Sequence, residues 1–158
     1  MKKKNELLTS TCLLLCLLTG CAKTSEDDQV RQEVLASFES LVASSKALDT
    51  QTYFKHFDNE KFSGLDASGQ NWNSIDDLRA LIEPGFNAVT KVDSLQFNNV
   101  KVTVVDSRNA VLVNEFEQLL TLKSGDQISL AGGGVQVWHK ADGNWLLVSV
   151  AASNKPQP

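Results

Sequence analysis

The chain has 158 residues, a formal net charge of −4 and three cysteines. This length suits one domain, which can bury a sufficient core without a disulfide. Beyond the three lysines at its start, this acidic chain lacks a basic cluster and is a poor candidate for binding nucleic acid, so we exclude that class of partner.

Residues 1–20 have the pattern of a bacterial secretory signal. Lys2, Lys3 and Lys4 form a basic start, and an uncharged, largely apolar run follows over residues 7–18. That run is too short to span a membrane. The next residues, Leu-Thr-Gly-Cys ending at Cys21, resemble the lipobox of bacterial lipoproteins. The resemblance implies cleavage before Cys21 and lipidation of its sulfur, whereas the alternative is an ordinary signal peptide.

Removal of the leader changes what the mature chain can do. Two of the three cysteines leave with it and the third is lipidated, so no thiol remains for a disulfide, a metal or a nucleophile. We therefore expect no metal and no cofactor. The net charge falls from −4 to −6, because the leader carries three lysines and Glu6.

Residues 21–25 would be the lipidated cysteine and a very short tether. Four extended residues span at most roughly 13 Å, so the domain should sit close to the lipid headgroups. More than one acyl chain gives stable anchoring, which places the protein in the bacterial cell envelope. Ala22 stands where aspartate would signal retention at the inner membrane. The resemblance thus implies the periplasmic face of the outer membrane, if the host is Gram-negative.

Three helices are predicted in the first half of the chain. Ser25 caps the first, and an apolar stripe at helical spacing follows over residues 30–48. Asp49 can cap a short second helix, and Ser74 opens a third. Pro84 and the glycine after it should kink or end this third helix, although Phe86 and Val89 would continue its stripe.

The second half of the chain has the alternation of a β-sheet. Residues 62–69 are dense in turn formers and predict a short strand or hairpin. Four longer strands are predicted over 92–105, 109–123, 127–140 and 144–153, joined by short turns into an antiparallel meander. Three glycines at 132–134 indicate a bulge or sharp bend. Helices followed by a curved sheet predict an α+β fold.

The last hairpin turns at residues 142–143, an Asp-Gly pair that favours a two-residue loop. This loop predicts Lys140 opposite Trp145, Trp138 opposite Leu147 and Gln136 opposite Ser149. One face of the hairpin is then nearly all aliphatic, and the other combines two tryptophans with polar groups.

The segment Val-Trp-His-Lys-Ala-Asp-Gly-Asn-Trp over 137–145, at the end of this order of elements, resembles the NTF2-like (SnoaL-like, cystatin-like) superfamily. The most similar branch contains the association domain of calcium/calmodulin-dependent protein kinase II. The resemblance implies a domain over 26–153 and a tail over 154–158. The implied fold is a cone, in which N-terminal helices pack in a strongly curved antiparallel sheet and leave a pocket. Members include isomerases, dehydratases, hydrolases and non-catalytic modules, so fold alone does not decide function.

The chain departs from that branch at two positions of the last strand. Ser149 and Ala151 stand where the branch commonly carries two histidines that point into the pocket. Hydroxyl and methyl groups cannot replace imidazole in proton transfer, so the departure argues against catalysis.

Two groups of site residues are predicted. Polar side chains among apolar neighbours, together with large aromatic ones, are expected to line the pocket: Trp72, Asn114, Phe116, Gln118, Gln136, Trp138, Ser149 and Ala151. Alternatively, Tyr53, His56 and Asp58 form an acid/base cluster in which Asp58 orients His56. In the simpler interpretation, Tyr53 is core and His56 is solvated.

The aliphatic face of the sheet also needs a cover, because an antiparallel sheet normally has one polar face. The simplest cover is a second copy of the chain. The expected homodimer interface contains Val111, Val113, Val135, Val137, Val148 and Val150.

These observations favour a lipid-anchored, non-catalytic domain that binds a small apolar or amphipathic molecule or a protein partner. The alternatives are an isomerase, dehydratase or hydrolase, and a purely structural dimerisation module. A cavity much smaller than about 300 Å³ would favour the structural module.

Overall fold

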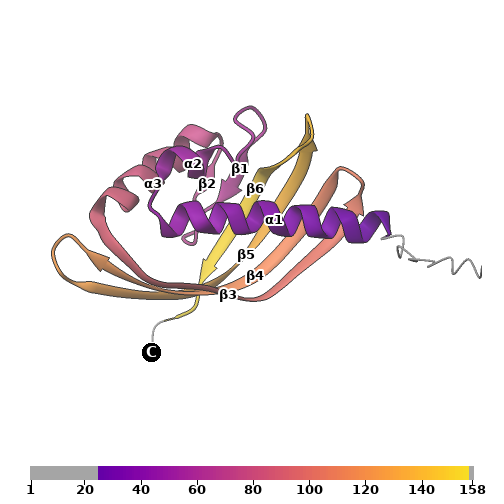
Figure 1. Cartoon of the computed structure of the whole chain (residues 1–158). Helices are drawn as coiled ribbons and strands as arrows, with labels where there is room; N and C mark the ends of the chain where they lie inside the picture. Colours follow the sequence, from indigo (N-terminus) through magenta and orange to yellow (C-terminus); the bar gives the residue numbers. More distant parts are fainter. Residues whose placement is uncertain (1–24, 157–158) are drawn as a thin grey trace, which may run out of the picture.

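The computed structural model of the chain describes residues 25–156. The predicted leader, Cys21 and most of the tether lie outside the described residues. Three helices precede the four long strands: α1 (Glu26–Lys46), α2 (Thr50–Phe54) and α3 (Ile75–Ala88). Helix α1 lies across the concave side of a curved sheet, and the other two helices cover one end of it (Figure 1).

All three predicted helix starts are confirmed. The side chains of Ser25, Asp49 and Ser74 each accept a hydrogen bond from a backbone N–H in the first turn. Pro84 was predicted to kink or end α3. It does not end the helix, which continues to Ala88. Pro84 is exposed, and the half-buried Phe86 keeps the apolar stripe against the protein. Packing of that stripe outweighs the cost of about 3 kcal/mol that a mid-helix proline imposes.

The sheet has six strands in the order β2-β1-β6-β5-β4-β3. Its long strands are β3 (Val89–Asp106), β4 (Asn109–Leu122), β5 (Gln127–Ala141) and β6 (Asn144–Asn154), which form the predicted antiparallel meander. The turn-rich segment forms a hairpin of β1 (Ser63–Leu65) and β2 (Asn71–Trp72). Strand β1 pairs with β6 in parallel, a contact that the sequence did not predict. The predicted α+β class with a strongly curved sheet is confirmed.

The core lies between α1 and the concave face of the sheet. Buried side chains of α1 meet buried side chains of β4, β5 and β6, among them Val34, Phe38, Leu112, Trp138 and Leu147. Trp138 is fully buried, and its indole N–H donates to the side-chain oxygen of Gln136. Within residues 25–156, no helix is both long and apolar enough to cross a membrane.

The register of the last hairpin is confirmed near its turn and wrong beyond it. Lys140 pairs with Trp145 and Trp138 pairs with Leu147, as predicted, but Gln136 pairs with Val150 instead of Ser149. A register shift between Val137 and Trp138 leaves one extra residue in β6. Such a bulge moves every later side chain of the strand to the opposite face.

The three glycines of β5 do not form a bulge, because the pairing of β4 with β5 runs through them without a register shift. Gly132 is required for close packing instead. A Cβ there would lie 2.0 Å from the carbonyl oxygen of Ser153 and 2.8 Å from the ring of Phe116. The glycine thus lets an aromatic ring of β4 lie against the backbone of β5.

Polar contacts fix α1 from both sides. Its Arg31 donates a hydrogen bond to the carbonyl of Val102 on β3. On the other side the carboxylate of Glu33 accepts from Lys140 at 2.6 Å and from the indole N–H of Trp145 at 2.8 Å. These two bonds, with a third from Gln29, lower the pKa of Glu33 from 4.5 to about 2.

Glu33→Gln should therefore remove a part of the stability that depends on pH. A lowered pKa in the folded state stabilises the protein above the ordinary value of 4.5 and loses this effect as the pH falls toward 2. The Glu33 side chain is 31% exposed, so solvent screens its interactions, and we expect the free energy of unfolding to fall by roughly 1–2 kcal/mol at pH 7. Urea unfolding of both proteins from pH 7 to pH 2 measures it. A difference between them that stays constant over this range would contradict the prediction.

Candidate functional site

A cavity of about 320 Å³ lies at the end of the molecule where α1 finishes, and we call it the cone cavity. It is partly open to solvent and is bounded by the end of α1, by α2 and α3, and by the curled ends of β3 and β4. Its lining is mostly apolar and contains Ser45, Leu48, Tyr53, Leu81, Ile82, Gly85, Phe86, Val89, Val92, Leu95, Gln118 and Leu120. A volume of this size is at the lower end of small-molecule sites.

Tyr53 and Gln118 supply the larger polar groups of the cone cavity. The Tyr53 ring packs against Phe54, Phe57 and Phe86, with centroid distances of 5.1–5.3 Å. Burial raises the pKa of the Tyr53 hydroxyl, which therefore stays protonated at physiological pH. Neither this hydroxyl nor the Gln118 carboxamide makes a hydrogen bond to another residue within 25–156. Both groups are available to a bound molecule.

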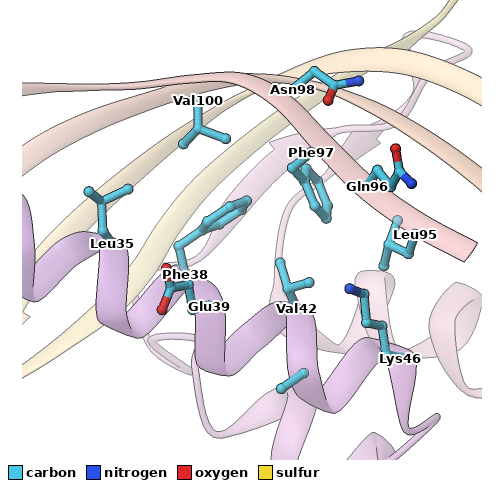
Figure 2. A pocket seen from close by; sticks show the side chains of 11 residues that line it. Leu35, Phe38, Glu39, Val42, Lys46, Leu95, Gln96, Phe97, Asn98 and Val100 are labelled. Carbon is cyan, nitrogen blue, oxygen red and sulfur yellow. The ribbon is translucent and has the colours of Figure 1, made fainter.

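A second hollow, which we call the α1–β3 groove, has a volume of about 670 Å³ and runs between the helix and the edge strand of the sheet. Phe38 and Val42 of α1 face Leu95 and Phe97 of β3 across it, while Asn98 points away (Figure 2). Phe38 and Phe97 meet edge to face at 5.0 Å, so part of the groove is filled by the protein itself.

His56 lies in a third hollow, the α1–hairpin groove, between α1 and the turn of the last hairpin. Its Nδ1 is 3.0 Å from the carbonyl oxygen of Thr52, and its Nε2 is 2.9 Å from the hydroxyl of Ser40. Since a carbonyl can only accept, Nδ1 carries a proton, and in the neutral imidazole Nε2 then accepts from Ser40. His56 thus links α2 to α1.

The predicted acid/base cluster is not assembled. Asp58 is buried, and its carboxylate accepts from the backbone N–H groups of Glu60 and Lys61, which stabilises the turn that follows α2. His56 bonds to Ser40, and Tyr53 faces the cone cavity. Three residues that are close in sequence therefore have three separate surroundings.

The residues predicted to line a pocket also separate. Gln118 lines the cone cavity, and Trp72 lies on β2 beside a shallow polar hollow while packing against the core. Asn114, Gln136 and Trp138 are buried on the inner face of the sheet. Phe116 is half-buried near Phe97, with a centroid distance of 6.4 Å.

The bulge in β6 changes the orientation of two further predicted residues. Ser149 pairs with Val137 and Ala151 pairs with Val135, so both belong to the outer face of the sheet. The expectation that they point into the pocket is therefore wrong. Val150, predicted for the outer face, instead pairs with Gln136 and packs against the core.

Sequence reasoning missed most of the cone cavity. Leu81, Ile82 and Phe86 of α3 and Val89 at the start of β3 form one of its walls. The signal was present as an apolar stripe that continues past Pro84, but a proline there predicts the end of a helix. No periodicity indicates that the C-terminal end of α1 packs near this stripe.

Four of the five remaining predicted interface residues lie on the outer face of the sheet. Val111 pairs with Val137 and Val113 pairs with Val135 across β4 and β5. Val113 is 43% exposed and Val135 is 44% exposed. Val148 is the extra residue at the bulge next to them. These valines form an aliphatic patch, which we call the outer valine patch.

Helices held in a curled antiparallel sheet, with a cavity at the open end, define the NTF2-like, cystatin-like class of α+β cones. The sequence matches the calcium/calmodulin dependent protein kinase II association domain family over residues 30–156, and the chain belongs to that family. A comparison with curated protein sequences finds no match.

Solved structures support the fold. The association domain of Caenorhabditis elegans CaMKII superposes with a TM-score of 0.67 at 18% identity, over 82% of this chain and 99% of that one. An NTF2-like superfamily protein of Salmonella enterica superposes with a TM-score of 0.71 at 17% identity, over 82% of this chain and 93% of that one. A candidate dehydratase of the NTF2-like family from Streptomyces avermitilis superposes with a TM-score of 0.72 at 12% identity, over 83% of this chain and 99% of that one. Identities this low support the fold and leave function open.

Proposed function

We propose that the protein is a non-catalytic, lipid-anchored NTF2-like domain of the bacterial envelope that binds a small apolar or amphipathic molecule in the cone cavity. The observation that carries this proposal is the cavity itself. Its volume of about 320 Å³ exceeds the size below which a purely structural module would be favoured. Apolar walls with a few polar groups are the usual surroundings of such a ligand.

The positions of His56 and Asp58 favour binding over catalysis. A general base must come within hydrogen-bond reach of the group from which it takes a proton. His56 bonds to Ser40 in a different hollow, and Asp58 bonds to the backbone of its own turn. Tyr53 would therefore face a substrate in the cone cavity without either of these partners.

The cone cavity lies far from the N-terminal end of α1. Helix α1 has 21 residues, so its two ends are about 31 Å apart. Lipidation at Cys21 would hold its N-terminal end near the membrane, while Ser45 and Leu48 at the other end line the cavity. We infer that the ligand enters from the aqueous side of the envelope.

The anchor has its own test. Cys21→Ser should release the protein from the membrane fraction, because the acyl chains attach to this sulfur and supply the affinity for the bilayer. Detergent phase partition and intact mass spectrometry of both proteins, expressed in a bacterial host, measure the effect. A wild-type protein without added acyl mass would contradict the proposal.

Native mass spectrometry tests the binding function. We expect the delipidated protein from its own host to carry a small molecule. Ile82→Trp places a larger side chain in the cone cavity and should lose that molecule. Ala43→Trp is the matched control, because Ala43 lines the α1–β3 groove instead. Loss of the molecule in the control alone would assign the site to the groove and contradict the proposal.

A further inference from the structure

Charge distinguishes the cone cavity from the other hollows of the molecule. Glu39 and Lys46 line the α1–β3 groove, and Glu33 and Lys55 line the α1–hairpin groove. Among the described residues that line the cone cavity, every side chain is apolar or uncharged.

This lining penalises a charged ligand. A carboxylate or ammonium group that leaves water loses several kcal/mol of hydration, which only a partner charge or a full set of hydrogen bonds can offset. The cavity walls offer neither an arginine nor a lysine for an anion, and neither an aspartate nor a glutamate for a cation. The molecule that fits must be uncharged as a whole.

The polar groups of the cavity indicate where its polar atom lies. Tyr53 presents an O–H donor, and Gln118 presents an amide that can both donate and accept. Neither side chain makes a hydrogen bond to another residue within 25–156. No buried side-chain nitrogen or oxygen atom among the described residues lacks a partner, so both groups reach solvent in the cavity. A ligand that displaces this solvent is favoured when it offers them an oxygen as acceptor, because a buried donor without a partner is costly. The aromatic rings around Tyr53 hold its hydroxyl in place.

Building on the ligand-binding function proposed above, we propose that the cone cavity selects an uncharged, largely apolar molecule with a carbonyl oxygen, which accepts hydrogen bonds from Tyr53 and Gln118. The apolar body lies against the leucine, isoleucine and valine side chains of α3 and β3. A fatty acid anion or an organic amine is excluded by the same lining.

Three probes with one ring system test this selectivity: methyl naphthyl ketone, naphthoate and naphthalene. Titration calorimetry on the full domain should show binding of the ketone, and at least about tenfold weaker binding of naphthoate. Tyr53→Phe and Gln118→Leu should each weaken ketone binding roughly three- to tenfold, the effect of one hydrogen bond. Naphthalene binding should not weaken in either variant. Gln96→Leu is the matched control, because Gln96 is exposed on β3 and does not line the cavity.

The outcomes separate this inference from the proposed function. Naphthoate that binds as tightly as the ketone would overturn the selectivity while leaving ligand binding intact. Ketone affinity unchanged in both Tyr53→Phe and Gln118→Leu would overturn the assigned polar contacts. Failure of all three probes to bind would overturn the binding function itself. Tyr53→Phe removes a single oxygen. If Tyr53→Phe disturbs folding, Gln118→Leu provides a second variant.

Discussion

Trp138→Ala is expected to lower the free energy of unfolding by about 4 kcal/mol. The indole is fully buried between α1 and the sheet, so its removal leaves a large cavity. The substitution also takes the hydrogen-bond donor from Gln136, which is only 8% exposed and would keep a buried oxygen without its partner. Domains of this size are stable by about 5–15 kcal/mol, so the variant would be marginal.

Urea unfolding followed by circular dichroism measures this loss. Trp72→Ala is the matched control, because Trp72 is partly exposed on the short edge strand β2 and should cost less. If Trp138→Ala does not fold, Trp138→Phe retains most of the volume and isolates the lost hydrogen bond. A smaller loss for Trp138→Ala than for Trp72→Ala would contradict this account of the core.

Val135→Asp is expected to convert a homodimer into a monomer. We propose that the outer valine patch is covered by a second copy of the chain, since Val113 and Val135 lie opposite each other and remain more than two-fifths exposed. The family is one of association domains, which supports pairing. A buried unpaired carboxylate costs several kcal/mol, so dimerisation should weaken at least about 100-fold.

Light scattering at tens of micromolar measures the oligomeric state. The wild-type protein should have the mass of a dimer, and Val135→Asp that of a monomer with unchanged circular dichroism. Gln32→Glu is the control, because it adds the same charge on an exposed position of α1, away from the outer face of the sheet. A monomeric wild type, or a variant that still dimerises, would refute the proposed interface.

Local sequence signals predicted the elements well. Ser25, Asp49 and Ser74 cap helices because their side chains bond to N–H groups only a few residues away. Asp142 and Gly143 both have positive φ, as a tight two-residue hairpin turn requires. The four long strands begin and end within about three residues of their predicted limits, since alternation and turn residues are read directly along the chain.

The candidate site was predicted much less well. Gln118 was identified from its polar side chain among apolar neighbours, but Ser149 and Ala151 were assigned to the wrong face. A single extra residue in β6 reverses the alternation, and nothing in the sequence near Val148 indicates it. Tyr53 was recognised as a site residue, yet its predicted partners, His56 and Asp58, lie elsewhere.

The class of the fold, the helix starts, the meander and the similarity to a family could all be predicted from the sequence, because each depends on residues a short distance apart. The set of residues that line the cone cavity could not be predicted in this way. Its walls combine the end of α1, the stripe of α3 past Pro84 and the curled starts and ends of β3 and β4, which lie far apart along the chain. Packing brings them together, and packing also overrode the local preference of Pro84 to end a helix.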